Sequence, residues 1–228
     1  KYDFLALPVV DAEERLVGIV TVDDAIDVIQ EETTEDMEMM AAISPSDKPY
    51  LKTGVFTTWK QRVPWLLLLM ISATFTSTII ASYEGALATS VVLTGFIHML
   101  MDTGGNAGSQ SSITVIRGLS LGEIRYRDVP RLVGKELCVA VLCGLSLAAA
   151  NFIKLMLVDR VTLPVAAVVS LTLVCVVLVS NFVGSVLPVL AKRIGFDPAV
   201  MASPFISTVV DVVTLVLYFQ VARAILHI

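Results

Sequence analysis

The chain has 228 residues, of which 56% are hydrophobic, and its mean hydropathy is +0.82. These values exclude an ordinary soluble domain and predict an integral membrane protein. The formal net charge of −5 is unevenly divided, because the first 48 residues hold 13 acidic and 3 basic side chains. Such an acidic segment has no basic patch to neutralise phosphates, so we expect no nucleic-acid partner.

Residues 1–30 have the pattern of a small α/β unit. The β-branched stretches PVV and LVGIVTV flank the polar turn DAEER and predict a hairpin, and DDAIDVI then opens a helix with carboxylates at its N-terminus. This pattern resembles the C-terminal part of a CBS domain, and a generic hairpin followed by a helix is the alternative. We therefore expect the chain to begin partway through a longer protein.

Residues 31–62 are predicted to form an acidic connecting helix and a linker. Nine acidic and no basic side chains lie between Asp23 and Asp47. Acids at three- and four-residue steps share one helical face and repel each other, which favours a low-affinity surface for divalent cations over a solvated helix. The segment SPSDKPYLKTG predicts a linker, and TTWKQRVPW predicts an amphipathic helix at the membrane interface. The acids of the shared face are Asp24, Asp27, Glu31, Glu35 and Glu38.

Residues 63–228 are predicted to form a pore domain of five transmembrane helices. The apolar stretches are roughly 64–82, 86–119, 132–158, 163–190 and 199–226, each long enough to cross the hydrocarbon layer. The glycine-rich GGNAG is expected to interrupt the second helix, which is tolerated at membrane depth only where backbone is buried or faces water. Close helix packing through small residues is the alternative.

Basic side chains gather in two predicted links, after the second and after the fourth membrane helix. The positive-inside rule places these links in the cytoplasm together with the acidic segment. We therefore expect a multi-pass protein of the inner (plasma) membrane, in contact with the lipid bilayer. Its N-terminus would be cytoplasmic and its C-terminus extracytoplasmic.

Asp211 is the residue with the clearest chemical meaning. It lies within an apolar stretch of membrane-spanning length, where a carboxylate is costly unless it faces a partner, a water-filled cavity or a cation. The only base of that stretch is Arg223, about 18 Å away by helix rise. A cation is therefore the expected partner. Further polar side chains expected to line the same path are Asn106, Asn181, Ser203, Ser207, Thr214 and Asp197.

Two of these residues have a structural alternative. Asn181 is equally well explained by an interhelical hydrogen bond, and Asp197 is also placed to cap the last helix ahead of Pro198. One carboxylate with hydroxyl, amide and carbonyl oxygens suits a hard cation such as Mg²⁺, which often binds as a hydrate. No cluster of thiolates or imidazoles favours a softer metal.

With these motifs in place, the sequence resembles the MgtE family of magnesium channels and transporters. The resemblance is carried by TGGNAGSQSSITVIRG and by FDPAVMASPFISTVVD, which follow the CBS-like part and the acidic helix. It implies an all-α polytopic membrane protein with five transmembrane helices, preceded by a partial α/β CBS-type domain and an acidic connecting (plug) helix. It also implies a homodimer with the pore on its two-fold axis, where Asp211 contacts the ion.

The resemblance further implies cytosolic Mg²⁺ sites that favour closure of the pore. Gln30 stands where another acid would extend this cluster. By position, the residues that match these regulatory sites are Asp24, Asp27, Glu32, Glu35 and Asp36.

We therefore expect a Mg²⁺-selective channel or transporter that imports magnesium and closes when cytosolic Mg²⁺ binds the acidic surface. Ion-coupled secondary transport of Mg²⁺, Co²⁺ or Mn²⁺ is the alternative, and a non-conducting membrane cation sensor is a weaker one. An enzyme is not expected, because the sequence offers no nucleophile–base pair, phosphate-cradling loop or His/Cys metal cluster.

Overall fold

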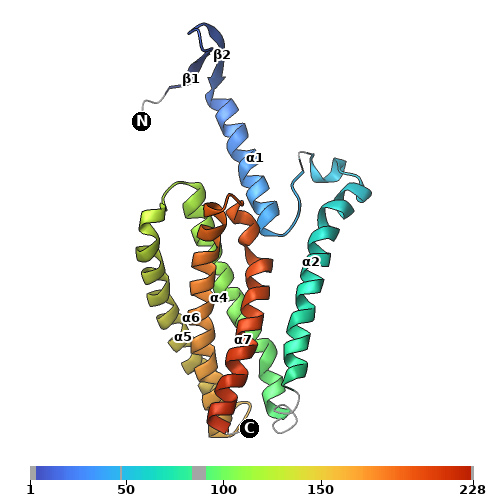
Figure 1. Cartoon of the computed structure of the whole chain (residues 1–228), viewed down its shortest axis with the longest axis vertical. Helices are drawn as coiled ribbons and strands as arrows, with labels where there is room; N and C mark the ends of the chain where they lie inside the picture. Colours follow the sequence, from blue (N-terminus) through green and yellow to red (C-terminus); the bar gives the residue numbers. More distant parts are fainter. Residues whose placement is uncertain (1–3, 47, 84–90, 227–228) are drawn as a thin grey trace.

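A computed structural model describes residues 4–46, 48–83 and 91–226. A hairpin and one helix project from the end of a bundle of long helices (Figure 1). Strands β1 (Ala6–Val10) and β2 (Leu16–Thr21) pair antiparallel, as the sequence predicts. The turn between them is held by the Asp11 carboxylate, which accepts hydrogen bonds from the backbone N–H groups of Glu13 and Arg15.

Helix α1 (Val22–Met40) is continuous across the boundary predicted at residues 30 and 31. A capping box formed by Thr21 and Asp24 starts it, because each side chain satisfies a backbone N–H that the first helical turn leaves unpaired. At its other end, Met39 and Met40 pack against Ile116 of α4 and against Ala199 and Ala202, in the segment just before the last helix. The acidic helix is thus seated on the membrane bundle by its final turn.

Helix α2 (Val55–Ser82) corrects one prediction. The interfacial segment and the first membrane helix form a single helix with Pro64 inside it, so the expected domain boundary at residues 62 and 63 falls within α2. Two hydrogen bonds tie the preceding linker to this helix, from Ser44 N–H to the Gln61 carbonyl (3.1 Å) and from Gln61 Nε2 to the Pro45 carbonyl (3.2 Å). Helix α2 lies against α7 and has no buried residue.

The bundle contains α4 (Thr94–Ser120), α5 (Val129–Leu157), α6 (Leu163–Arg193) and α7 (Ser203–Leu226). Short 3-10 turns precede three of them: η2 (Val91–Leu93), η3 (Tyr126–Asp128) and η4 (Pro198–Met201). Helix α6 is central and packs against α4, α5 and α7. The largest core side chains include Tyr218, whose hydroxyl donates to the Leu93 carbonyl over 2.9 Å.

Helix α4 is unbroken, so the predicted interruption at GGNAG is wrong. The glycines instead permit close packing. A Cβ at Gly104 would lie 2.6 Å from Val176 Cγ1, and one at Gly108 would lie 2.8 Å from Ile206 Cγ2. Gly184 of α6 faces the backbone of Gly108 so closely that it leaves no room for a Cβ. Small residues let helix backbones approach in this way without exposing their hydrogen-bonding groups.

Four described spans are long and apolar enough to cross a membrane: 55–82, 126–157, 163–193 and 198–226. Helix α4 is not among them, because it carries a polar face (Asp102, Asn106, Gln110). Helix α7 starts at Ser203 rather than near Ala199, since Ala202 is extended after η4. The basic links α4–α5 and α6–α7 lie at the end of the bundle that carries α1, and the C-terminus lies at the other end (Figure 1).

Candidate functional site

Asp211 lies half-buried on α7, about 12 Å along the helix from Ser203. It borders a pocket of about 230 Å³ between α4 and α7. Asn106 and Ser207, both predicted from the sequence, share this pocket with it. Its full lining is His98, Met101, Asp102, Gly105, Asn106, Ser207 and Asp211.

Asp102 is a second carboxylate at this site, and the sequence analysis did not single it out. It is close enough to Asp211 for the two side chains to interact electrostatically. Its Oδ2 accepts a hydrogen bond of 3.2 Å from Asn106 Nδ2. The available signal was its spacing: His98, Asp102 and Asn106 are four residues apart and therefore share one face of α4.

The chemistry of this pocket favours hard cations. Two carboxylates, an amide and a hydroxyl offer oxygen ligands of the kind that Mg²⁺ binds, directly or through its water shell. Among the described residues, no three His, Cys, Asp or Glu side chains are close enough together to enclose a metal ion. The pocket therefore fits a hydrated ion better than a dehydrated one held by protein ligands alone.

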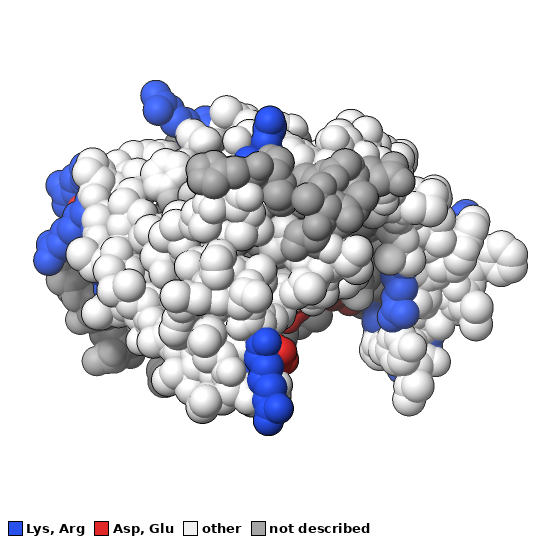
Figure 2. Space-filling view, turned by 90° about the horizontal axis from the view of Figure 1, so that it is seen from below, with Lys and Arg blue, Asp and Glu red and all other residues white. Residues whose placement is uncertain are grey.

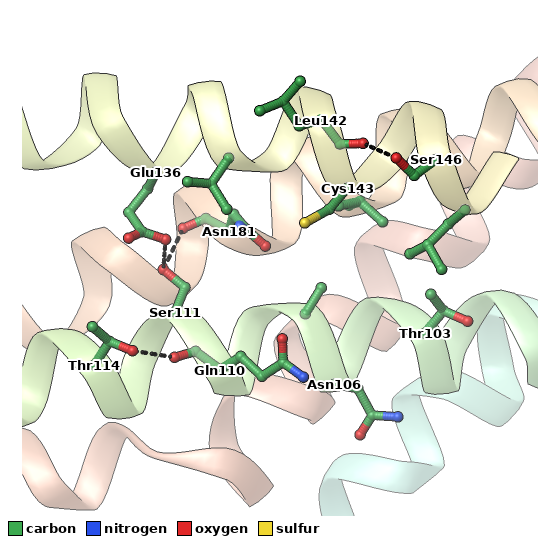
Figure 3. Close-up of a pocket in the computed structure, with 14 residues that line it drawn as sticks. Thr103, Asn106, Gln110, Ser111, Thr114, Glu136, Leu142, Cys143, Ser146 and Asn181 are labelled. Carbon is green, nitrogen blue, oxygen red and sulfur yellow. Dashed lines mark hydrogen bonds between the residues drawn. The ribbon is translucent and has the colours of Figure 1, made fainter. Parts of the chain in front are cut away.

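Asn181 lies elsewhere, in a larger pocket of about 740 Å³ that α4, α5 and α6 line (Figure 3). Only 6% of Asn181 is exposed, and its Oδ1 has no hydrogen-bond partner among the described residues. Glu136 of α5 and Ser111 of α4 line the same pocket and are joined by a hydrogen bond of 2.9 Å. Asn106 borders both this pocket and the Asp211 pocket.

Two further residues predicted to line the path, Thr214 and Asp197, border neither pocket. Thr214 is 1% exposed, inside the bundle, with no hydrogen-bond partner for its hydroxyl among the described residues. Asp197 caps η4 at the end of the bundle, where its Oδ1 accepts from the Ala199 N–H over 2.7 Å. The side chain of Ser203 lies outside the described part of the structure.

The five predicted regulatory acids are spread along α1. Asp24 is engaged at the start of the helix, and its hydrogen bonds with the Thr21 side chain and backbone hold its pKa below the usual range. Asp27 is exposed and forms no salt bridge among the described residues. Glu32 and Glu35 border a surface pocket of about 540 Å³ between α1 and the linker.

Asp36 faces the bundle. Burial raises the pKa of its carboxyl, and the charges of Asp197 and Glu32 raise it further, while a hydrogen bond with Ser120 lowers it. Asp36 and Asp197 thus bring like charges together where α1 is seated on the bundle. A cation or a proton at this junction would relieve their repulsion.

The end of the molecule opposite α1 carries little charge near its centre. Figure 2 shows Lys and Arg at the periphery of this face, and acidic side chains mainly in the recess between the bundle and α2. Most of the anionic groups visible from this end thus lie within a hollow.

Comparison with known proteins gives a consistent result. Residues 1–31 match the CBS domain, and residues 97–221 match the MgtE family, described as a divalent cation transporter. The curated relatives include magnesium transporters MgtE of Thermus thermophilus, 40% identical over 99% of this chain, and of Enterococcus faecalis, 36% identical over 97%. That of Bacillus subtilis is 34% identical over the whole chain. The chain spans about half the length of these curated relatives, 48–50%.

Proposed function

This chain belongs to the MgtE family of divalent cation transporters, and we propose that it carries Mg²⁺ across the plasma membrane past Asp211. The observation that supports this most is the pairing of Asp211 on α7 with Asp102 on α4 in one pocket. Two acids that face each other at membrane depth are costly unless a cation or a proton neutralises them. Amide and hydroxyl oxygens beside them suit a hydrated Mg²⁺.

A second copy of the chain would close this pocket. His98, Asp102 and Asn106 are exposed on the surface of α4, and such groups do not face lipid in stable membrane proteins. We therefore place this face at the two-fold axis of a homodimer, where two Asp211 side chains approach the same ion. The ion would then meet four carboxylates rather than two.

Regulation is proposed to act through α1. At low cytosolic Mg²⁺ the acids of α1 repel each other, and Asp36 repels Asp197, so α1 is released from the bundle and the pore is open. At high Mg²⁺ the ion neutralises these groups and α1 is seated. Mg²⁺ shifts this equilibrium only as far as it binds the seated state more tightly. The N-terminus would accordingly be cytoplasmic and the C-terminus extracytoplasmic.

Divalent flux into proteoliposomes tests the pore assignment, with the full-length protein and its Asp211→Asn and Asp102→Asn variants. Each variant is expected to lose at least about tenfold of Mg²⁺ flux, because a charged partner in a desolvated site is worth about 1.5–3 kcal/mol. The matched control is Asp159→Asn, which removes an acid outside both pockets whose salt bridge is with Lys154. Its flux should match that of the unmodified protein.

Unchanged flux in both pocket variants would reject the ion path at Asp211. Imposed gradients separate the channel from coupled transport in the same vesicles. Flux through a channel depends only on the voltage and the Mg²⁺ gradient. Flux that requires a Na⁺ or H⁺ gradient at fixed voltage would instead identify a coupled transporter.

A further inference from the structure

Glu136 is a buried carboxylate that the Asp211 pocket leaves unexplained. It lies on α5, about 10 Å along the helix from Val129, and is 9% exposed. Within the described part of the chain, its side-chain hydrogen bond is with the Ser111 hydroxyl, which donates to Glu136 Oε2 over 2.9 Å. No described lysine, arginine or histidine forms a salt bridge with it. One neutral hydroxyl does not offset the cost of burying an ionised carboxylate.

Several oxygen atoms around Glu136 have few or no hydrogen-bond donors engaged with them. Ser111 has a single hydroxyl proton, and besides Glu136 it lies 3.3 Å from the Asn181 backbone carbonyl. The Asn181 side chain adds a buried Oδ1 without a partner. In Figure 3, Glu136, Ser111 and Asn181 converge at one end of the pocket. The cluster is therefore rich in oxygen atoms that need a proton or a cation.

The pocket has room for a hydrated ion. Its volume is about 740 Å³, whereas six water molecules occupy about 180 Å³ at 30 Å³ each. Gln110 and Asn106 continue the polar lining along α4 towards Asp102. Ser111 is about 14 Å further along α4 than Asp102 and, nine residues on, lies on the other side of this helix, so Asn106, which borders both pockets, is the residue that connects them.

We propose that Glu136, Ser111 and Asn181 form a second cation site, which holds a hydrated divalent cation between α4, α5 and α6. This inference rests on the proposed function and adds to it a second binding position for the ion, nearer the end of the bundle that carries the basic links and α1. Glu136 supplies the charge, and the Asn181 and Ser111 oxygens accept hydrogen bonds from the water shell of the ion.

Labelling with dicyclohexylcarbodiimide tests occupancy at Glu136 itself. The reagent takes the carboxyl proton on nitrogen and bonds through its central carbon to the carboxyl oxygen, so a bound cation blocks the reaction. Full-length protein in chelator is labelled with and without added Mg²⁺, and the modified peptide is measured by mass spectrometry. Mg²⁺ is expected to protect Glu136, and Na⁺ at equal ionic strength is not.

Two matched variants separate a site from a general effect. Asn181→Ala should raise the Mg²⁺ concentration for half-protection about tenfold, as loss of a supporting oxygen does at metal sites. Asn151→Ala on α5 removes another amide that borders neither pocket, and should leave protection unchanged. Equal labelling of Glu136 with and without Mg²⁺ would overturn the inference, as would protection that disappears in Asp211→Asn.

A second readout uses Cys143, which lines the same pocket. With Cys138 and Cys175 changed to Ser, a trifluoromethyl group on Cys143 reports bound Mn²⁺ through broadening of its fluorine resonance. Broadening that Mg²⁺ competes away and that Glu136→Gln abolishes supports the site, even if the carbodiimide does not react. Absence of broadening in the labelled protein that keeps Glu136 rejects it.

Failure of the inference and failure of the proposed function give different results. Mg²⁺ flux without protection at Glu136 leaves the proposed function standing and removes the second site. If Mg²⁺ protects Glu136 but no Mg²⁺ flux is seen under any imposed gradient, the second cation site is supported and the proposed transport function is rejected.

Discussion

We expect Asp36 to make the docking of α1 depend on pH, because the raised pKa of its carboxyl beside Asp197 favours protonation when α1 is seated. The seated state therefore binds the proton more tightly, so seating strengthens as the pH falls towards this raised pKa and weakens as the pH rises through it. In chelator, acidification should bury a cysteine placed at Met40, which packs against the bundle when α1 is seated. Asp36→Asn should keep α1 seated at every pH.

Maleimide labelling of Met40→Cys measures this, with the three native cysteines changed to Ser. The labelling rate of the protein with Asp36 is divided by that of the Asp36→Asn variant at each pH. This ratio removes the pH dependence of the reaction of the thiol with maleimide, which is the same in both proteins. That ratio is expected to fall towards one as the pH falls. A ratio that does not change with pH would contradict the proposed repulsion at this junction.

The role of a single residue could be predicted from the sequence where the residues around it in the same helix were enough to suggest that role. Asp211 stands out because no group within its own helix neutralises it. Asp102 and Glu136 gain their meaning only from residues on other helices, such as Asp211 and Asn181. The spacing of polar residues along α7 did not show that Thr214 is buried inside the bundle and borders neither pocket, because that also depends on the neighbouring helices.

At the scale of elements, the contact between α4 and α6 depends on glycine. A Cβ at Gly184 would meet the backbone of Gly108, which does not turn aside as a side chain does. We expect Gly184→Ala to destabilise the folded protein by about 1–3 kcal/mol, as overpacking generally does. Thermal inactivation in mild detergent measures this effect.

Gly134→Ala on α5 is the matched control, because a Cβ there meets open space. It should be neutral or stabilise α5 by about 0.5–1 kcal/mol, since alanine is the better helix former. Equal stability of the two variants would show that the α4–α6 contact tolerates a wider separation.

The positions of the long helices were largely predictable, because apolar runs of membrane length fix them. Two predictions about helix boundaries differ from the structure: the break expected at GGNAG, and the separate interfacial helix expected before Pro64. Glycine weakens an isolated helix, yet the close approach of α6 keeps α4 helical through Gly104 and Gly108. The interfacial segment is part of α2 because Pro64 removes a single backbone hydrogen bond, and the helix continues on both sides of it.

At the scale of the whole molecule, the charge of α1 should set the response to Mg²⁺. Replacing Asp24, Asp27, Glu32 and Glu35 with Asn or Gln in the full-length protein removes most of the charge that Mg²⁺ neutralises. We expect inhibition by cytosolic Mg²⁺ to weaken at least about tenfold, while the pocket at Asp211 stays intact. Flux against internal Mg²⁺ concentration measures this, and unchanged inhibition would disprove regulation through α1.

The last turn of α1 is attached to two membrane helices at once. Met39 and Met40 pack against Ile116 of α4 and against Ala199 and Ala202, just before α7, while Ser44 and Pro45 are hydrogen-bonded to Gln61 of α2. Only three residues separate Met40 from Ser44, so this tether has almost no slack. Any tilt of α1 should therefore pull on α2 as well as on the segment that leads into α7. In the proposed regulation, the junction would act as a lever with two output arms, so that one movement of α1 is transmitted to α2 and to the start of the Asp211 helix together.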